Sequence, residues 1–102
     1  MNTSYMHKAA NLLLVDNAGY ECDDEATEIV GAATAKLTVA ECAEFETWAA
    51  TLGEGELATA CMGSDITSEG GMGRAMEDEE TGNVVVCPDV ACKVLDTMFE
   101  CL

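Results

Sequence analysis

The strongest helix signal in the chain is TVAECAEFETWAATLG, residues 38–53. Thr38 and Glu41 form a capping-box pattern, in which each side chain satisfies a backbone N–H of the other residue at the start of a helix. One apolar stripe follows at helical spacing and consists of Cys42, Phe45, Trp48, Ala49 and Leu52. We expect the closing glycine to end this helix. We expect Glu44 and Glu46, which flank the stripe, to face water.

Further helical patterns lie on both sides of this stretch. Apolar residues recur at helical spacing over residues 4–18, and again over a segment that begins at Asp23 or Asp24. A final helix is expected to begin at Pro88, because the fixed φ and missing N–H of proline suit a first helical position. Residues 55–62 favour a shorter helix.

One segment near the end of the chain favours extended backbone. Residues 84–86 are three consecutive valines, and β-branched side chains are typical of strands. Their best antiparallel partner is residues 72–77. A chain of 102 residues has room for one core. The sequence therefore predicts a single mainly α domain, residues 1–102, with four to five short helices and a small β-hairpin at about residues 72–87.

Composition excludes several classes of protein. The chain carries 20 Asp and Glu residues against 4 Lys and Arg, a net charge of -16, so it has no basic face for nucleic acid or anionic membranes. Its 49% hydrophobic content is too high for a disordered acidic tail. The apolar run at residues 9–15 is interrupted by Asn11 and followed by Asp16, which is not the pattern of an export signal. We expect a cytoplasmic protein, located in the host cytoplasm if a phage encodes it.

The negative charge is concentrated in two segments. Residues 21–56 hold ten acidic residues and one lysine, and residues 77–80 are all acidic. If the second and third helices pack as neighbours, their outer carboxylates form one acidic face. The candidate partner-binding residues are Asp23, Asp24, Glu25, Glu28, Glu41, Glu44, Glu46, Glu54, Glu56, Glu77, Asp78, Glu79 and Glu80.

Crowded like charges destabilise a small domain, so the acidic surface requires an explanation. A solvated surface or a high-salt habitat are two explanations that stay open. The third is a non-catalytic inhibitor that blocks a basic nucleic-acid-binding partner by presenting carboxylates in place of phosphates. Small acidic proteins of this kind occur among phage-encoded anti-CRISPR proteins. The analogy rests on size, charge and the absence of catalytic groups, since no motif ties the chain to such a family.

Catalytic and cofactor signals are weak. The single histidine, His7, has no orienting acid beside it, so we expect no enzyme. The closest cysteine pair is Cys87 and Cys92, and no Cys-x-x-Cys pattern occurs, so we expect no metal and no cofactor. The six cysteines are expected to be thiols, several of them on apolar faces.

Two alternative functions remain open at this stage. The first is a thiol or metal-binding accessory protein that uses Cys87 and Cys92. The second is a small oligomerising structural or assembly component, such as a homodimer formed through the apolar face of the last helix.

Overall fold

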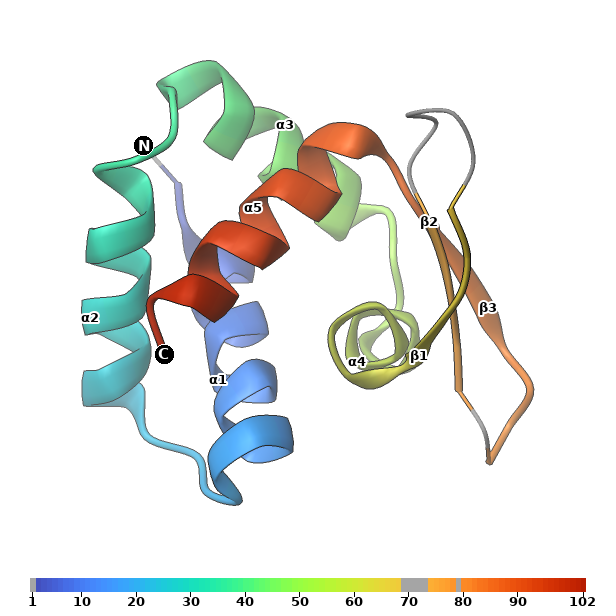
Figure 1. The fold of residues 1–102 in the computed structure, drawn as a ribbon. Coiled ribbons are helices and arrows are strands. Elements are labelled where there is room, and N and C mark those ends of the chain that lie inside the picture. The colour runs from blue at the N-terminus through green and yellow to red at the C-terminus, as the bar shows by residue number, and fades with distance from the viewer. Residues whose placement is uncertain (1, 69–73, 79) are drawn as a thin grey trace.

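The computed structural model describes residues 2–68, 74–78 and 80–102. Within this part of the chain, five helices surround the core and a three-stranded antiparallel sheet lies on one side of them (Figure 1). The elements in chain order are α1 (Ser4–Ala18), α2 (Asp23–Thr34), α3 (Val39–Ala50), α4 (Glu54–Met62), β1 (Ser64–Ser68), β2 (Arg74–Glu77), β3 (Val84–Cys87) and α5 (Asp89–Glu100). The prediction of a mainly α fold with a small hairpin is confirmed.

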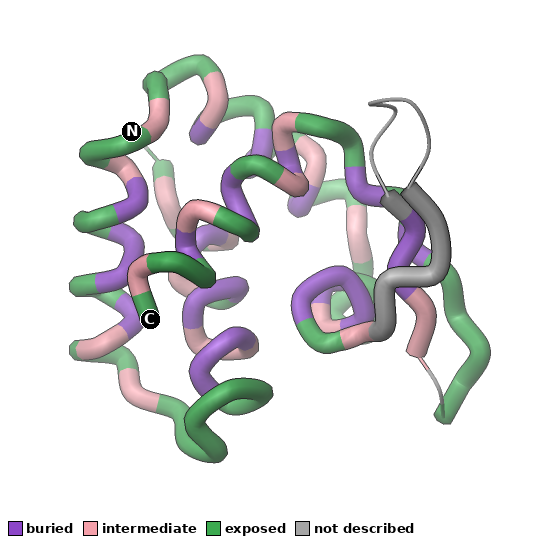
Figure 2. Tube along the Cα trace, in the orientation of Figure 1, coloured by how far each residue is buried: buried purple, intermediate pink, exposed green. Residues whose placement is uncertain are grey.

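Helix α1 is the central helix of the fold. It contacts α2, α3, α4 and α5, and its buried side chains are Met6, Ala9, Ala10, Leu13 and Leu14. Figure 2 shows that the buried positions of α1 and α2 turn toward each other. Both helices carry buried alanines, Ala9 and Ala10 on α1 and Ala26 and Ala33 on α2.

The first turn of α1 is capped by a residue from α3. The carboxylate of Glu46 accepts the backbone N–H of Tyr5 at 3.1 Å through one oxygen and that of Met6 at 2.8 Å through the other. Asn2 accepts the N–H of Ser4 at 3.1 Å. These N–H groups have no partner within the helix, so Glu46 and Asn2 together satisfy the first turn. A negative charge also suits the positive end of the helix dipole.

The helix at residues 38–53 ends earlier than the sequence indicates. Its capping box is present as predicted, but α3 stops at Ala50. Gly53 does not close α3; it is the N-cap of α4, where its N–H donates to the Glu56 side chain at 3.0 Å. A local glycine signal therefore marks the start of the next helix rather than the end of this one.

Helix α5 buries its apolar face inside the domain. Ala91, Val94, Leu95 and Met98 are buried, and α5 contacts α1, α2 and α3 (Figure 1). Pro88 is the N-cap of this helix rather than its first residue. Because the apolar stripe of α5 is part of the core, it is not the surface through which two copies could associate.

The sheet has the order β1-β2-β3 and packs against α4. Strands β2 and β3 form the predicted hairpin over residues 74–77 and 84–87, while residues 72 and 73 of the predicted strand lie outside the described residues. Strand β1 pairs with β2 and was not predicted. Gly63 connects α4 to β1 where the backbone is crowded. A Cβ atom there would lie 2.5 Å from the Thr59 carbonyl oxygen and 2.7 Å from that of Glu77. Only glycine allows the chain to pass from helix to sheet at this point.

The Glu46 cap predicts a specific loss of stability. In Glu46→Ala the N–H groups of Tyr5 and Met6 lose their acceptor, so we expect the free energy of unfolding to fall by about 1–3 kcal/mol. The matched control is Glu44→Ala, which removes an exposed acid from the same helix and is expected to change stability by about 0.5 kcal/mol or less. Urea unfolding measures both. Equal losses in the two variants would show that the cap does not stabilise the fold.

Candidate functional site

Three of the predicted partner-binding carboxylates are helix caps. Glu41 accepts the N–H of Thr38 at 2.9 Å, Glu56 caps α4, and Glu46 caps α1. The expectation that Glu46 faces water is wrong, because only 7% of it is exposed. Its burial is possible because two backbone N–H donors hold the carboxylate. Glu46 is therefore removed from the set of residues that a partner can reach.

Glu41 is also paired with a lysine from a distant helix. Its carboxylate accepts a hydrogen bond from the Lys93 ammonium of α5. This contact, followed by the hydrogen bond from the Thr38 N–H, lowers the pKa of Glu41. The ion pair joins α3 to α5 and neutralises one of the acids counted in the acidic segment.

Two of the acids at the start of α2 also have hydrogen-bond partners within the chain. Asp23 accepts a hydrogen bond from the Asn11 side chain at 2.9 Å. Glu25 accepts the Tyr20 hydroxyl at 2.8 Å, which raises the pKa of Tyr20. Asp24 lies beside these residues, is exposed, and makes no side-chain hydrogen bond or ion pair with the described part of the chain.

The outer carboxylates of α2 and α3 do not form the single face that neighbouring helices would give. Both helices pack on α1 and α5 rather than on each other. Asp24 and Glu28 are exposed on α2, and Glu44 is exposed on α3. The largest predicted acidic surface is therefore divided between two helices that share no substantial interface.

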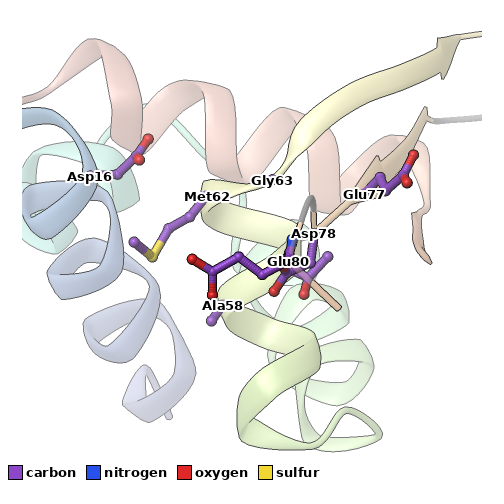
Figure 3. Close-up of a pocket in the computed structure, with 8 residues that line it drawn as sticks. Asp16, Ala58, Met62, Gly63, Glu77, Asp78 and Glu80 are labelled. Carbon is purple, nitrogen blue, oxygen red and sulfur yellow. Dashed lines mark hydrogen bonds between the residues drawn. The ribbon is translucent and has the colours of Figure 1, made fainter. Parts of the chain in front are cut away.

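A different group of acids gathers where α4 meets α1. One hollow of about 420 Å³ is lined by Asp16, Ala58, Thr59, Met62, Gly63, Glu77, Asp78 and Glu80 (Figure 3). A second hollow of about 330 Å³ is lined by Lys8, Asn11, Leu12, Val15, Glu21, Glu54 and Leu57. Both hollows are lined by residues of α1 and α4, the two helices that they border. We call them together the α4 groove.

The acids of the α4 groove come from four parts of the chain. Asp16 lies near the end of α1, Glu21 in the following loop, Glu54 on α4, and Glu77, Asp78 and Glu80 around the hairpin. Figure 3 shows the Glu80 side chain pointing toward Ala58 and the Glu77 side chain pointing away from it. The fold thus brings together four of the predicted residues. Glu79 lies outside the described residues.

Hydrogen bonds to Asp78 join residues of the hairpin turn beside the groove. One Asp78 oxygen accepts the N–H of Glu80 at 2.9 Å and that of Thr81 at 3.3 Å. The Gly82 N–H donates to the Asp78 carbonyl oxygen at 2.7 Å, and Gly82 has a φ of 73°. This left-handed conformation favours glycine. Asp78 is therefore committed to the turn, whereas the Glu80 carboxylate is exposed to a partner.

Asp16 and Glu21 were not singled out in the sequence. Asp16 stands apart from other acids in the sequence, whereas Glu21 belongs to the acidic segment 21–56 and lies two residues before Asp23. The packing of α1 against α4 places Asp16 near Glu80 and Glu21 near Glu54. The sequence carried no local signal for Asp16, but the charge clustering that marked Asp23 could have included Glu21.

Cys87, one of the two thiols of the predicted accessory site, is buried, and the Cys92 thiol donates to the Cys87 carbonyl oxygen at 3.4 Å. No group of three or more His, Cys, Asp or Glu side chains among the described residues is placed to hold a metal ion. Burial raises the pKa of Cys61 to about 12, with added effects from Cys87 and Asp16, so its reactive thiolate is scarce at neutral pH. His7 is occupied locally, since its Nδ1 lies 2.8 Å from the Thr3 carbonyl oxygen.

Comparisons with protein families, curated proteins and solved structures find no match for the chain. None of the helices in the described part of the chain combines the length and apolar character needed to cross a membrane. The candidate site therefore rests on the geometry of this chain alone, in which the α4 groove is bordered by six acids and by Lys8.

The Glu41–Lys93 pair predicts a change in titration. In Lys93→Met the largest cause of the lowered pKa is lost, so we expect the pKa of Glu41 to rise while staying below its usual value, because the Thr38 N–H still donates. NMR titration of the side-chain carboxyl carbon measures this. An unchanged pKa would contradict the pairing.

The same shift fixes the direction of the pH dependence of stability. Folding lowers the pKa of Glu41, so its contribution is fully present above the unfolded pKa of about 4.3 and is lost as the pH falls through the lower folded pKa. We expect Lys93→Met to reduce this acid-dependent part of the stability.

Proposed function

We propose that the protein is a non-catalytic acidic binding protein that blocks a basic, nucleic-acid-binding partner. The observation that supports this most is the α4 groove, where carboxylates from four parts of the chain line two hollows. The net charge of -16 adds a long-range attraction for any cationic surface.

The α4 groove suits the shape and chemistry of arginine and lysine side chains. Asp16, Glu54 and Glu80 are exposed, and their carboxylates make no hydrogen bond or ion pair with the described part of the chain. Val15 and Met62 are 39% and 37% exposed beside them. The apolar stems of Lys and Arg can pack on such side chains while their charged ends reach carboxylates.

In its most specific form, the proposal is that the protein acts as a DNA mimic. Proteins that bind DNA present Lys and Arg at sites that meet phosphates, and carboxylates can occupy those sites. In size and charge, the protein is comparable to phage anti-CRISPR proteins. The protein would act in the cytoplasm, in that of the host cell if a phage encodes it, and would contact no nucleic acid itself.

The role of the α4 groove is tested with two matched triple variants. Asp16→Asn, Glu54→Gln and Glu80→Gln together neutralise the groove, whereas Asp24→Asn, Glu28→Gln and Glu44→Gln together remove the same charge from α2 and α3. We expect the groove triple to weaken binding of an arginine-rich peptide by about tenfold or more, and the control by about threefold or less. Isothermal titration calorimetry at low ionic strength measures both affinities.

Equal weakening by the two triple variants would contradict a defined binding groove and would indicate general charge attraction. Strong peptide binding that does not change with salt would contradict the electrostatic basis altogether. Urea unfolding of both variants checks that each remains folded.

DNA mimicry is tested by displacement from a nucleic-acid-binding effector. An RNA-guided nuclease is bound to a labelled target duplex, and fluorescence anisotropy follows the duplex as the protein is added. We expect release of the duplex at low salt, weaker release as salt rises, and about tenfold more of the groove triple variant for the same effect. No release at any salt concentration would contradict this form of the proposal.

A further inference from the structure

Strand β3 is an edge of the sheet with two exposed valines. The order β1-β2-β3 leaves one side of β3 without a neighbouring strand. Val85 and Cys87 are buried, on the strand face that packs toward α4. Val84 is 53% exposed and Val86 is 64% exposed, so the outer face of β3 presents apolar side chains next to an open edge.

The hydrogen-bond register shows which backbone groups point to that edge. Asp78 donates its N–H to the Asn83 carbonyl oxygen at 2.9 Å, which makes these residues a hydrogen-bonded pair. Such pairs alternate along an antiparallel ladder. The pair of Met76 with Val85 is therefore hydrogen-bonded, whereas the pair of Glu77 with Val84 is not.

By the same alternation, Val84 and Val86 direct their N–H and C=O groups away from β2. No hydrogen bond joins these backbone groups to any other residue that the structure describes. An edge of this kind is a template for another strand. The exposed valines and the unpaired backbone groups belong to the same two residues, so backbone and side chain would contact an added strand together.

We propose that the β3 edge accepts an extended segment of the basic partner as a fourth strand of the sheet. This inference rests on the proposed function, because it takes the partner to be cationic. Glu77 lies directly across from Val84, and its carboxylate is on the same outer face as the valine. Asp78 and Glu80 lie in the turn that leads into β3, so their charges add to the long-range attraction for a cationic segment. A segment in which Lys or Arg alternates with β-branched residues fits this surface.

Charge favours a basic partner over a second copy of this chain. Two copies would each bring a net charge of -16 to the contact. Pairing through β3 would add few hydrogen bonds, because the strand has four residues. Like-charge repulsion opposes that association, whereas a cationic strand gains both the hydrogen bonds and the attraction.

The test uses two peptides of equal charge. One alternates Lys with Val and favours a strand; the other alternates Lys with Gly and does not. We expect the Lys–Val peptide to bind the wild-type protein about fivefold or more tightly than the Lys–Gly peptide, since it adds backbone hydrogen bonds at the edge. Amide hydrogen exchange should become slower at Val84 and Val86 when the Lys–Val peptide is bound.

A matched pair of variants locates the contact. Val86→Pro removes the N–H that points to the edge and breaks no ladder bond to β2, whereas Val86→Thr keeps this N–H and the β-branched shape. We expect Val86→Pro to lower affinity for the Lys–Val peptide about fivefold and to leave the Lys–Gly peptide unaffected. We expect Val86→Thr to bind both peptides as the wild type does.

A second measurement keeps the test valid if Val86→Pro does not fold. N-methylation of the backbone amides of the Lys–Val peptide should remove its advantage over the Lys–Gly peptide, with the wild-type protein unchanged. If this advantage persists, backbone pairing is wrong.

The remaining outcomes separate the two proposals. If both peptides bind the wild type equally well, strand addition is overturned and the proposed function stands. If neither peptide binds at low ionic strength, the proposed function fails and this inference fails with it. If sedimentation shows a wild-type dimer that Val86→Pro abolishes, a second copy occupies the edge and the basic partner does not.

Discussion

The contact between Glu46 and the first turn of α1 is the constraint on which the arrangement of helices depends. Burying an ionised glutamate, here a residue that is only 7% exposed, is costly unless donors hold its carboxylate. Here the donors are the N–H groups of Tyr5 and Met6, which themselves need an acceptor. Each group satisfies the other, so α3 is joined to the central helix at one position. Because α1 also contacts α4, its placement fixes the position of Asp16 in the α4 groove.

Most of the fold could be predicted because its signals are local. Helical spacing located the helices, and the valines at 84–86 located the hairpin. Strand β1 escaped prediction because residues 64–68 lack that β-branched run. Glu46 was misplaced for a different reason. Helical spacing puts Glu46 at the edge of the buried stripe, beside Cys42 and Ala49, but its charge predicted exposure; only a helix that begins about 40 residues earlier supplies the donors that allow its burial.

The candidate site was predictable only in part, because clustering in sequence and clustering in space select different acids. The Glu41 and Glu56 side chains cap the helices in which they lie. Asp23 accepts a hydrogen bond from the Asn11 side chain. Asp16 is isolated in the sequence and Glu21 precedes the acidic start of α2, yet both border the α4 groove. Helix caps therefore occupy some of the carboxylates that stand out most in the sequence, whereas helix packing brings together others that were not selected from the sequence.

The hairpin turn links the two surfaces that carry the proposals. Glu80 reaches into the α4 groove from the turn (Figure 3), and Val84 begins the open edge a few residues later. Within the described residues, the Asp78 carboxylate accepts the Glu80 N–H, and the Gly82 N–H donates to the Asp78 carbonyl oxygen. A cationic segment paired with β3, as proposed, would pass close to the acidic turn. The cost of binding is lower when both contacts are formed in advance.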